Sequence, residues 1–380
     1  MEISDYRKQI DTIDEQLVKL FTRRMEVSAE IGRFKQENDI PVYDAERERK
    51  KLGQISEMTD SSMNTYTDAL YSLIFELSRS YQRKLSGEKN PIKDSINAAL
   101  ENTQNLFPGR SLVACQGVEG AYSQQACEKI FSSPQIMYFN SFEGVFSAID
   151  KGLCQYGILP LENSTAGSVN KIYDLMMQYD FKIVRSTRIK IDHCLMAAEG
   201  AEMSGIKEIF SHEQAISQCE SFLSELKGVK ITPCANTAAA AKLIMESGRT
   251  DAAAIASPVC EELYGLKCLK ASIQDQGSNY TRFICISKKL EIYPGADKTS
   301  IMMILHHKPG SLYKVLSRFN ALGVNLQKLE SRPLQNSDFE FMFYFDLDIS
   351  VYSPEFIHIF DDIEGMAVSF KYLGSYSEVV

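Results

Sequence analysis

The sequence has 380 residues, too many for one ordinary hydrophobic core, so two or three domains are expected. Apolar residues make up 44% and charged residues 24%, as in soluble globular proteins. The net charge of -9 argues against a general binder of nucleic acids or anionic membranes.

The first residues, MEISDYRKQID, contain no apolar signal core, and no run of the sequence is long enough to span a bilayer. The nine cysteines are scattered from Cys115 to Cys285 and never form a CxxC pair. This pattern favours reduced core thiols in a cytoplasmic protein over disulfides or a metal site.

Residues 1–90 have a helical rhythm and are expected to form an all-α domain. Apolar residues recur at three-four spacing, which predicts a seam that packs against other helices. Asp44 precedes AERERKKLGQI and can cap a second helix, and a third helix is expected from Tyr66 to Tyr81. The seam of the first helix consists of Ile3, Tyr6, Ile10, Ile13, Leu17, Leu20, Val27, Ile31 and Phe34.

Arg24 stands in this seam where an apolar residue is expected. A buried, unpaired arginine costs several kcal/mol, so the position suggests an anion-binding role. The alternative is a helix that curves away and leaves Arg24 in solvent. The resumed rhythm at Val27 and Ile31 favours binding.

Arg7 and Lys35 lie on one flank of the same predicted helix, 28 residues apart. At 1.5 Å per residue they are separated by roughly 42 Å, so one chain cannot bring both to one small ligand. An antiparallel second chain could, and a site that uses both residues therefore implies a dimer. Further polar candidates are Asp44, Arg47, Glu48, Ser78 and Gln82.

These segments, RKQIDTIDEQLVKLFTRRMEVSAEIGRFK and PVYDAERER with the Ser78/Gln82 pair, closely resemble the all-helical chorismate mutase domain. The resemblance implies an interlocked dimer in which Arg7 comes from the partner chain. It implies that Arg24, Arg47 and Ser78 bind substrate carboxylates, and that Lys35 and Gln82 donate to the ether oxygen. Asp44 and Glu48 would accept from the hydroxyl or its surroundings. A Claisen rearrangement needs fixed cations and a held conformer, but no nucleophile, metal or cofactor.

Residues 91–109 are predicted to be a polar linker that follows a break at SGEKNP. Residues 110–290 alternate short apolar runs with amphipathic helices, which predicts an α/β domain with a largely parallel sheet. The number of units suits two lobes around a cleft.

Two loops of this segment are candidates for ligand contacts. GVEGAYS, residues 117–123, can present backbone N–H groups to an anion, or can be a tight strand–helix turn. GILPLENSTAGSV, residues 157–169, gathers polar residues after a buried strand, where open α/β sheets usually bind ligands. His193 and His212 could be acids or bases, or core histidines.

GILPLENSTAG, IDHCLM, FSHEQAISQC and NYTRF, in this order, resemble prephenate dehydratase over nearly all of residues 110–290. The resemblance implies a fold of two α/β lobes, similar to periplasmic binding proteins. It implies that Thr281 is catalytic, and that the cleft positions are Glu162, Asn163, Ser211, Gln218 and Arg282. Because a strand alternates, Thr281 and Arg282 cannot both face the leaving hydroxyl, and Thr281 is the expected one. Arg282 is then expected to hold a carboxylate or to brace the lobe from the other side.

Residues 298–380 follow the order βαββαβ, which is the ferredoxin-like order. With HKPGSLYKVL and LESRP, the segment resembles the ACT domain attached to prephenate dehydratases. The resemblance implies feedback regulation by L-phenylalanine bound between paired domains. An oligomerisation module without ligand is the alternative. The matching effector positions are Gly310, Ser311, Leu312, Asn325, Glu330, Ser331 and Arg332.

Three functions are compatible with these patterns. The first, and the expected one, is a bifunctional homo-oligomeric enzyme that converts chorismate to prephenate and prephenate to phenylpyruvate. The second is a dehydratase whose helical segment only dimerises, and Arg24 in the seam speaks against it. The third is a non-enzymatic ligand sensor, which Thr281 at the cleft disfavours. No cofactor is expected for either reaction.

Overall fold

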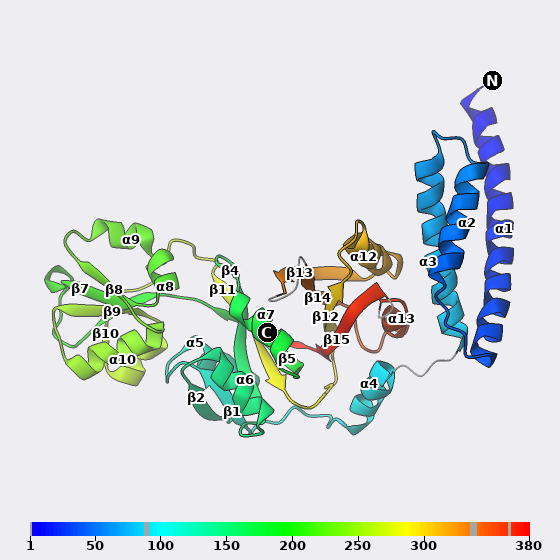
Figure 1. Ribbon diagram of the computed structural model, residues 1–380. Helices are drawn as coiled ribbons and strands as arrows, with labels where there is room; N and C mark the ends of the chain where they lie inside the picture. The colour runs from blue at the N-terminus through cyan, green and yellow to red at the C-terminus, as the bar shows by residue number, and fades with distance from the viewer. Residues whose placement is uncertain (1, 87–90, 335–339, 364–365) are drawn as a thin grey trace. The chain divides into compact units, whose positions relative to one another are not determined.

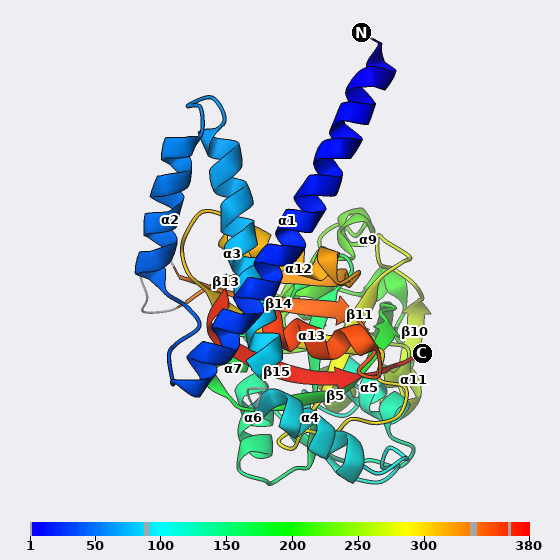
Figure 2. The same ribbon diagram turned by 90° about the vertical axis from the view of Figure 1, so that its right-hand side faces the viewer.

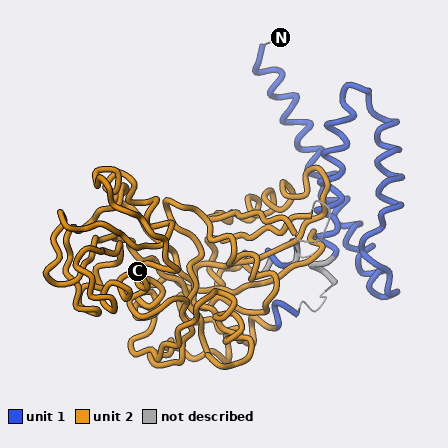
Figure 3. Tube along the Cα trace, turned by 60° about the vertical axis from the view of Figure 1, so that its left-hand side comes forward, with its two compact units in different colours: residues 1–94, 358–365 blue, residues 95–357, 366–380 orange. Residues whose placement is uncertain are grey.

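The computed structural model describes residues 2–86, 91–334, 340–363 and 366–380. It divides into two compact units, which Figure 3 distinguishes by colour. One contains residues 1–94 and 358–365, and the other contains residues 95–357 and 366–380. Among the helices of the described residues, none combines the length and the apolar content that a membrane crossing needs.

The first unit contains three long helices, α1 (Ile3–Glu37), α2 (Ala45–Met58) and α3 (Asn64–Ser86) (Figures 1 and 2). Helix α3 contacts both α1 and α2. The predicted cap is present, because the Asp44 side chain accepts a hydrogen bond from Arg47 N at 2.9 Å. The break predicted at SGEKNP includes residues 87–90, which lie outside the described residues.

The N-terminal part of α1 extends away from α2 and α3, as Figure 2 shows, and every side chain from Glu2 to Leu20 is exposed. The predicted apolar seam is therefore open to solvent in the single chain. Leu17 is 56% exposed and Leu20 is 71% exposed, and Tyr66, Leu70 and Leu73 of α3 are exposed as well. A large exposed apolar face of this kind marks a protein interface.

The linker prediction is wrong in part, because residues Pro91–Asn102 form helix α4. Its residues Ile96 and Ala99 are buried, so three-four spacing does exist within this polar segment. The helix was not predicted because its apolar stripe is short and polar residues surround it.

The second unit begins with a lobe built on a seven-stranded sheet, here called lobe 1 (Figure 1). The strands follow the order β16-β5-β11-β3-β1-β2, and β4 pairs with β3. Their bounds are β1 (Leu112–Gln116), β2 (Gln135–Phe139), β3 (Tyr156–Asn163), β4 (Gly167–Ser168), β5 (Lys182–Lys190), β11 (Tyr280–Ser287) and β16 (Glu378–Val379). The helices are α5 (Tyr122–Ile130), α6 (Phe142–Asp150) and α7 (Asn170–Gln178).

Lobe 2 is inserted between β5 and β11 and has a five-stranded sheet in the order β10-β6-β9-β7-β8. Its strands are β6 (Cys194–Ala197), β7 (Glu208–Ser211), β8 (Lys230–Pro233), β9 (Ala252–Ala256) and β10 (Lys267–Lys270). Its helices are α8 (Glu213–Ser217), α9 (Glu220–Glu225), α10 (Thr237–Ser247) and α11 (Val259–Tyr264), with a 3₁₀ turn at Met203–Gly205.

The prediction of a largely parallel sheet is wrong, because both sheets are mixed. Strand β1 runs parallel to β2 and β3, whereas β11 runs antiparallel to β3 and β5. The chain leaves lobe 1 after β5 and returns from lobe 2 directly into β11. Strand β11 therefore enters the sheet from the end at which β3 leaves it, and the two must run in opposite directions.

The C-terminal βαββαβ fold has the predicted element order. It consists of β12 (Lys298–Leu305), α12 (Ser311–Ala321), β13 (Asn325–Pro333), β14 (Phe341–Asp348), α13 (Pro354–Ile363) and β15 (Ala367–Tyr376). The strand order β13-β14-β12-β15 is antiparallel throughout. After β15, the short β16 pairs in parallel with β5 and so joins the sheet of lobe 1.

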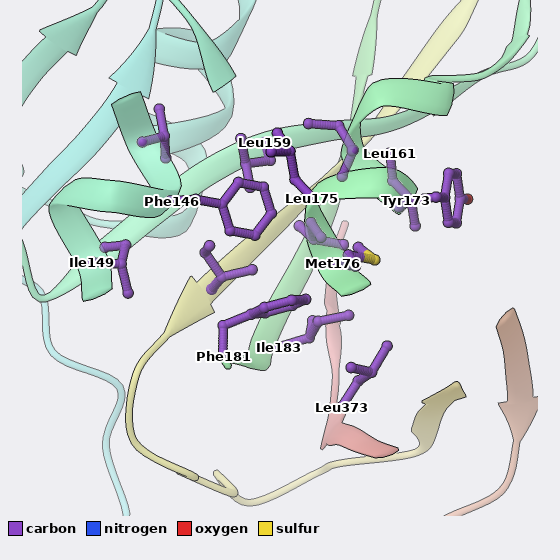
Figure 4. Close-up of a cluster of buried hydrophobic side chains, with 14 of the residues drawn as sticks. Phe146, Ile149, Leu159, Leu161, Tyr173, Leu175, Met176, Phe181, Ile183 and Leu373 are labelled. Carbon is purple, nitrogen blue, oxygen red and sulfur yellow. The ribbon is translucent and has the colours of Figure 1, made fainter. Parts of the chain in front are cut away.

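One hydrophobic cluster joins lobe 1 to the C-terminal fold (Figure 4). Phe146, Tyr173 and Phe181 of lobe 1 lie in the same buried cluster as Leu373 of β15. Tyr344 of β14 belongs to it as well, and its ring packs edge-on against Tyr173 with 5.1 Å between the centroids. The two folds therefore share one core.

Candidate active sites

A cleft of about 320 Å³ lies between lobe 1 and lobe 2. Lobe 1 contributes the ends of β1, β3 and β11 and the first turn of α5. Lobe 2 contributes α8 and the first turn of α10. The polar side chains among its lining residues are Gln116, Tyr122, Ser123, Asn163, His193, His212, Gln214, Gln218, Asn236, Thr237 and Thr281.

Asn163 and Thr281 lie opposite each other on β3 and β11, at the cleft end of both strands. Asn163 Oδ1 accepts hydrogen bonds from Thr165 N at 3.0 Å and Ala166 N at 2.9 Å. These two backbone donors fix the orientation of the amide, so its Nδ2 must point towards Thr281. Asn163 Nδ2 donates to Thr281 Oγ1 at 2.9 Å and to Asn279 Oδ1 at 2.7 Å.

Two residues from the lobe 2 side of the cleft complete this polar network. Gln218 donates from Nε2 to Thr165 Oγ1 at 3.0 Å, and His193 Nε2 lies 3.0 Å from Gln218 Oε1. Because Gln218 Oε1 can only accept, His193 carries its proton on Nε2. Burial lowers the pKa of His193, against the opposing effect of this hydrogen bond. The ring therefore tends to stay neutral and to hold Gln218.

None of the residues that line the described cleft is a lysine, arginine, aspartate or glutamate. The first turns of α5 and α10 face the cleft, and helix N-termini attract anions through their backbone N–H groups. The turn at residues 117–123 that leads into α5 needs two glycines in left-handed conformations, with φ of 112° at Gly117 and 86° at Gly120. The arrangement suits a small anionic ligand that is bound by dipoles.

Three residues predicted for the cleft lie elsewhere. Ser211 is fully buried and donates to Ile255 O at 2.8 Å. Glu162 and Arg282 pair across β3 and β11 on the face opposite to Asn163 and Thr281. Ser211 and Glu162 therefore do not line the cleft. Arg282 lies on the other side of its strand, as expected for a residue that braces the lobe from there. Strand alternation turns Glu162 and Arg282 towards the C-terminal fold. Ser211 is buried at the end of β7 in lobe 2.

In the first unit, α1 and α3 bring three of the predicted residues together. Arg24 Nη1 donates to Ser78 Oγ at 2.5 Å, and its guanidinium lies 5.6 Å from the centre of the Phe75 ring. Arg24 is half-buried between Ser78 and Phe75, so the alternative of a fully solvated arginine is wrong, and this burial lowers its pKa. Gln82 is buried beside Ser28, and its Oε1 has no hydrogen-bond partner among the described residues.

The other predicted residues of this unit are spread more widely. Lys35 donates to Pro41 O at 3.1 Å and to Val42 O at 2.8 Å. Glu48 pairs with Arg79, which the sequence patterns did not single out. Asp44 caps α2, Arg47 follows it in the first turn, and Arg7 lies on the exposed part of α1. Arg7 lies 17 residues along α1 from Arg24, so a single chain does not bring these two predicted cations together.

The structure divides the predicted effector residues between two faces of β13. Glu330 accepts from Ser168 Oγ at 2.5 Å, and Arg332 pairs with Asp174 of α7 at 3.1 Å. Ser331 is exposed on the opposite face, and Asn325 is exposed at the start of the strand, before a bulge between Leu326 and Lys328. Gly310, with φ of 83°, caps α12 just before Ser311 and Leu312. Strand alternation turns Glu330 and Arg332 towards lobe 1 in the single chain, and their part in an effector site between paired domains stays a prediction.

Several residues of these sites were missed or left open by the sequence patterns. Asn279 and Thr165 join the Asn163 network, and His193 turns out to line the cleft. The polar run NYTR at the mouth of a buried strand was the available signal for Asn279. Nothing in the local sequence indicates that Lys328 or Asp346 contacts lobe 1.

Comparisons with known proteins agree with this division of the chain. The prephenate dehydratase family model matches residues 113–291, and the chorismate mutase type II model matches residues 6–83. The bifunctional chorismate mutase/prephenate dehydratase of Aquifex aeolicus is 30% identical and covers 100% of this chain and 99% of its own length. Arogenate dehydratase 2 of Petunia hybrida is 34% identical over 78% of this chain and 79% of its own length.

Among solved structures, a prephenate dehydratase from Arthrobacter aurescens in complex with L-Phe is 27% identical, with a TM-score of 0.65. The match covers 70% of this chain and 90% of that one. Two family models in one chain and a relative aligned end to end lead to one conclusion. The chain belongs to the family of bifunctional chorismate mutase/prephenate dehydratases.

Proposed function

We propose that this protein rearranges chorismate to prephenate in its helical domain, and converts prephenate to phenylpyruvate in the cleft between lobes 1 and 2. The observation that carries the second step is the Thr281 hydroxyl, which lines the cleft and accepts a hydrogen bond from Asn163. Since its oxygen accepts from Asn163, its proton remains available for the cleft. Neither reaction needs a cofactor or a metal ion.

The mutase step is catalysed by fixed cations and donors. Arg24 with Ser78, and Arg47, bind the carboxylates of chorismate, while Lys35 and Gln82 donate to the ether oxygen as its bond breaks. Asp44 and Glu48 orient the cations and the substrate hydroxyl. Charge that develops at the ether oxygen is stabilised by donors that are already in place, which is an effective way to lower a barrier.

A second copy of the chain completes the mutase site. The exposed apolar face of α1 and α3 needs a cover, and an antiparallel partner would supply one. In an antiparallel pair, Arg7 of the partner subunit lies close to Lys35 of the first chain. A homodimer, alone or within a larger homo-oligomer, therefore explains both the apolar face and the missing cation.

The dehydratase step breaks two bonds of prephenate. The bond from the ring to its carboxylate breaks, and its electron pair completes the aromatic ring. Carbon dioxide leaves, the ring C–O bond breaks, and hydroxide departs with a hydrogen bond from Thr281. The hydroxide takes up a proton from solvent and is released as water. Aromatisation supplies the driving force, so a polarised donor at the leaving oxygen is sufficient. Asn163 and Gln218 position Thr281 and the substrate, and the helix N-termini of the cleft attract its carboxylate groups.

L-phenylalanine is the proposed feedback effector, bound at the C-terminal fold near Gly310, Ser311, Leu312, Asn325 and Ser331. The Arthrobacter aurescens relative was solved in complex with L-Phe, which supports this effector. Glu330 and Arg332 then act from the side that contacts lobe 1. We further propose a cytoplasmic protein, supported by nine cysteines that are all free thiols.

The test is an assay of purified protein supplied with chorismate, with and without L-phenylalanine, in which chorismate, prephenate and phenylpyruvate are followed together. Phenylpyruvate should form and should decrease when phenylalanine is added. Prephenate and arogenate are also supplied separately, because one relative is named for arogenate. Faster turnover of arogenate, or the absence of phenylalanine binding by calorimetry, would contradict the corresponding part of the proposal.

A further inference from the structure

Strands β3 and β11 present different residues to the two sides of their sheet. Thr281 pairs with Asn163 in the register, and the next pair along the strands is Arg282 with Glu162. The first pair lines the cleft, and the second faces the C-terminal βαββαβ fold. Adjacent residues of one strand thus touch the reaction site on one side and a different fold on the other.

Arg282 is held in the core by groups from three strands. Its Nη1 donates to Asp346 Oδ2 of β14 at 2.6 Å and to Glu162 Oε1 at 3.2 Å. Its Nη2 donates to Tyr376 OH of β15 at 2.9 Å. Arg282 is 5% exposed and Asp346 is 2% exposed, so this is a buried ion pair.

The remaining bonds of Asp346 are also satisfied within the C-terminal fold. Its Oδ1 accepts from Ser300 Oγ at 2.5 Å and from Tyr344 OH at 2.6 Å. Among the described residues Arg282 Nε has no hydrogen-bond partner, but both Nη atoms and both Asp346 oxygens are bonded. Such a buried pair fixes geometry, and removal of one member leaves a costly buried charge. The position of β11 therefore depends on groups that belong to the C-terminal fold.

Glu162 links the same cluster to β13, the strand that carries part of the proposed effector set. Lys328 Nζ donates to Glu162 Oε2 at 2.6 Å and to Ser168 Oγ at 2.9 Å. Ser168 in turn donates to Glu330. A continuous series of hydrogen bonds therefore runs from β13 through Glu162 to Arg282, one residue from Thr281.

We propose that Arg282 is a positioning residue, which holds Thr281 in register for the dehydratase step and transmits the state of the C-terminal fold to the cleft. The inference rests on the proposed dehydratase function and its regulation by phenylalanine. Small displacements of a catalytic donor reduce rates strongly, so a change at β13 that moves Glu162 or Arg282 is sufficient to alter Thr281.

The experiment compares Arg282→Met, Arg282→Lys and Asp346→Asn with the unaltered chain. For each, kcat and KM for prephenate are measured, with phenylalanine binding by calorimetry and residual activity at saturating phenylalanine. Arg282→Met should lower kcat by about tenfold or more, while KM changes by less than about twofold, because the guanidinium does not touch substrate. Arg282→Lys should restore part of kcat.

Asp346→Asn tests transmission. This variant should bind phenylalanine normally, yet keep a larger fraction of its activity when saturated with it. The matched control is Lys171→Gln, which breaks the exposed Lys171–Glu143 ion pair of the same lobe, 2.7 Å long, and should alter neither property.

Two results would overturn the inference. One is a rise in KM of about tenfold with kcat retained in Arg282→Met, which identifies Arg282 as a substrate ligand. The other is full inhibition of Asp346→Asn by phenylalanine. If thermal melts show that a variant of Arg282 or Asp346 does not fold, Glu162→Gln and Lys328→Gln replace it. These two residues are less buried members of the same hydrogen-bond series, and the same kcat, KM and inhibition measurements are made on them. An unaltered chain without inhibition by phenylalanine reveals a failure of the proposed regulation instead, and the kcat and KM comparison still decides the positioning role. An unaltered chain without prephenate turnover contradicts the proposed dehydratase function and, with it, the positioning role.

Discussion

Asn163 donates a hydrogen bond from Nδ2 to the hydroxyl oxygen of Thr281 across 2.9 Å. Two backbone N–H groups hold the amide in this orientation, so the hydroxyl proton of Thr281 is directed elsewhere. A threonine is a weak acid in isolation, and a donor to its oxygen makes it a better one. This relationship gives Thr281 its proposed role.

Replacement of Thr281 by alanine should remove the dehydratase activity and leave the mutase activity intact. Loss of the donor to the leaving hydroxyl is expected to lower kcat by roughly 100-fold or more. Thr281→Ser keeps the hydroxyl and should retain a substantial part of the rate. Both activities are measured in one preparation. Loss of both in Thr281→Ala would indicate misfolding, and full dehydratase activity would exclude the role.

Lys35→Ala should lower mutase turnover far more than it lowers stability. The ammonium group makes two hydrogen bonds to loop carbonyls, Pro41 O and Val42 O, which contribute only about 0.5–1.5 kcal/mol each. Its proposed task at the breaking ether bond is worth roughly 100-fold in rate. Chorismate consumption and a denaturant melt are compared with those of Lys19→Ala, a variant on the same exposed helix. Unchanged mutase turnover would remove Lys35 from the site.

The shared mutase site can be tested by complementation. Arg7→Ala and Lys35→Ala are each expected to be inactive as mutases, but a mixed dimer contains one complete site, because Arg7 and Lys35 of a site come from different chains. Random reassembly of equal amounts gives half mixed dimers with one of two sites intact, so about a quarter of the activity should return.

The control mixture is Arg24→Ala with Lys35→Ala. Both residues belong to the same chain's half of the site, so every dimer in this mixture has two defective sites. Recovery of activity in the control, or none in the Arg7/Lys35 mixture, would contradict a site shared in this way.

His193 should make the protein less stable in acid. Burial lowers its pKa in the folded protein, whereas the unfolded chain has an ordinary value near about 6.5. As the pH falls below that value, the unfolded chain binds a proton that the folded protein resists, so the free energy of unfolding decreases. His193→Asn removes this contribution, and its stability should fall less between about pH 7.5 and pH 5.5. Equal losses in both proteins would show that His193 is protonated in the fold.

The sequence patterns predicted the three-part organisation and the βαββαβ order well, because periodicity and turn residues determine them locally. They predicted that Thr281 and Arg282 face opposite sides, since strand alternation requires it. They could not tell that the far side is covered by the C-terminal fold. That knowledge depends on Asp346 and Tyr376, which lie 64 and 94 residues along the chain.

The errors have the same origin. Strand β5 was not predicted because four of its nine residues are lysine or arginine, and tertiary contacts stabilise it. The sheets were expected to be largely parallel because helix–strand alternation does not reveal a chain that returns from a second lobe. The contacts of Glu330 and Arg332 with lobe 1 were not predicted, because a short sequence motif does not say which neighbour covers each face of its strand.

Strand β16 also has a consequence for synthesis. Its residues, Glu378 and Val379, pair with Ser186 and Thr187 of β5, so the sheet that holds Thr281 is completed by residues translated after the whole C-terminal fold. At 5–20 residues per second, roughly 5 to 20 s pass between translation of β11 and of β16. During that interval the edge of β5 is open, and an open strand edge can pair with other chains. The nascent dehydratase lobe should therefore be most prone to aggregation, and most dependent on chaperones, just before the ribosome reaches these residues.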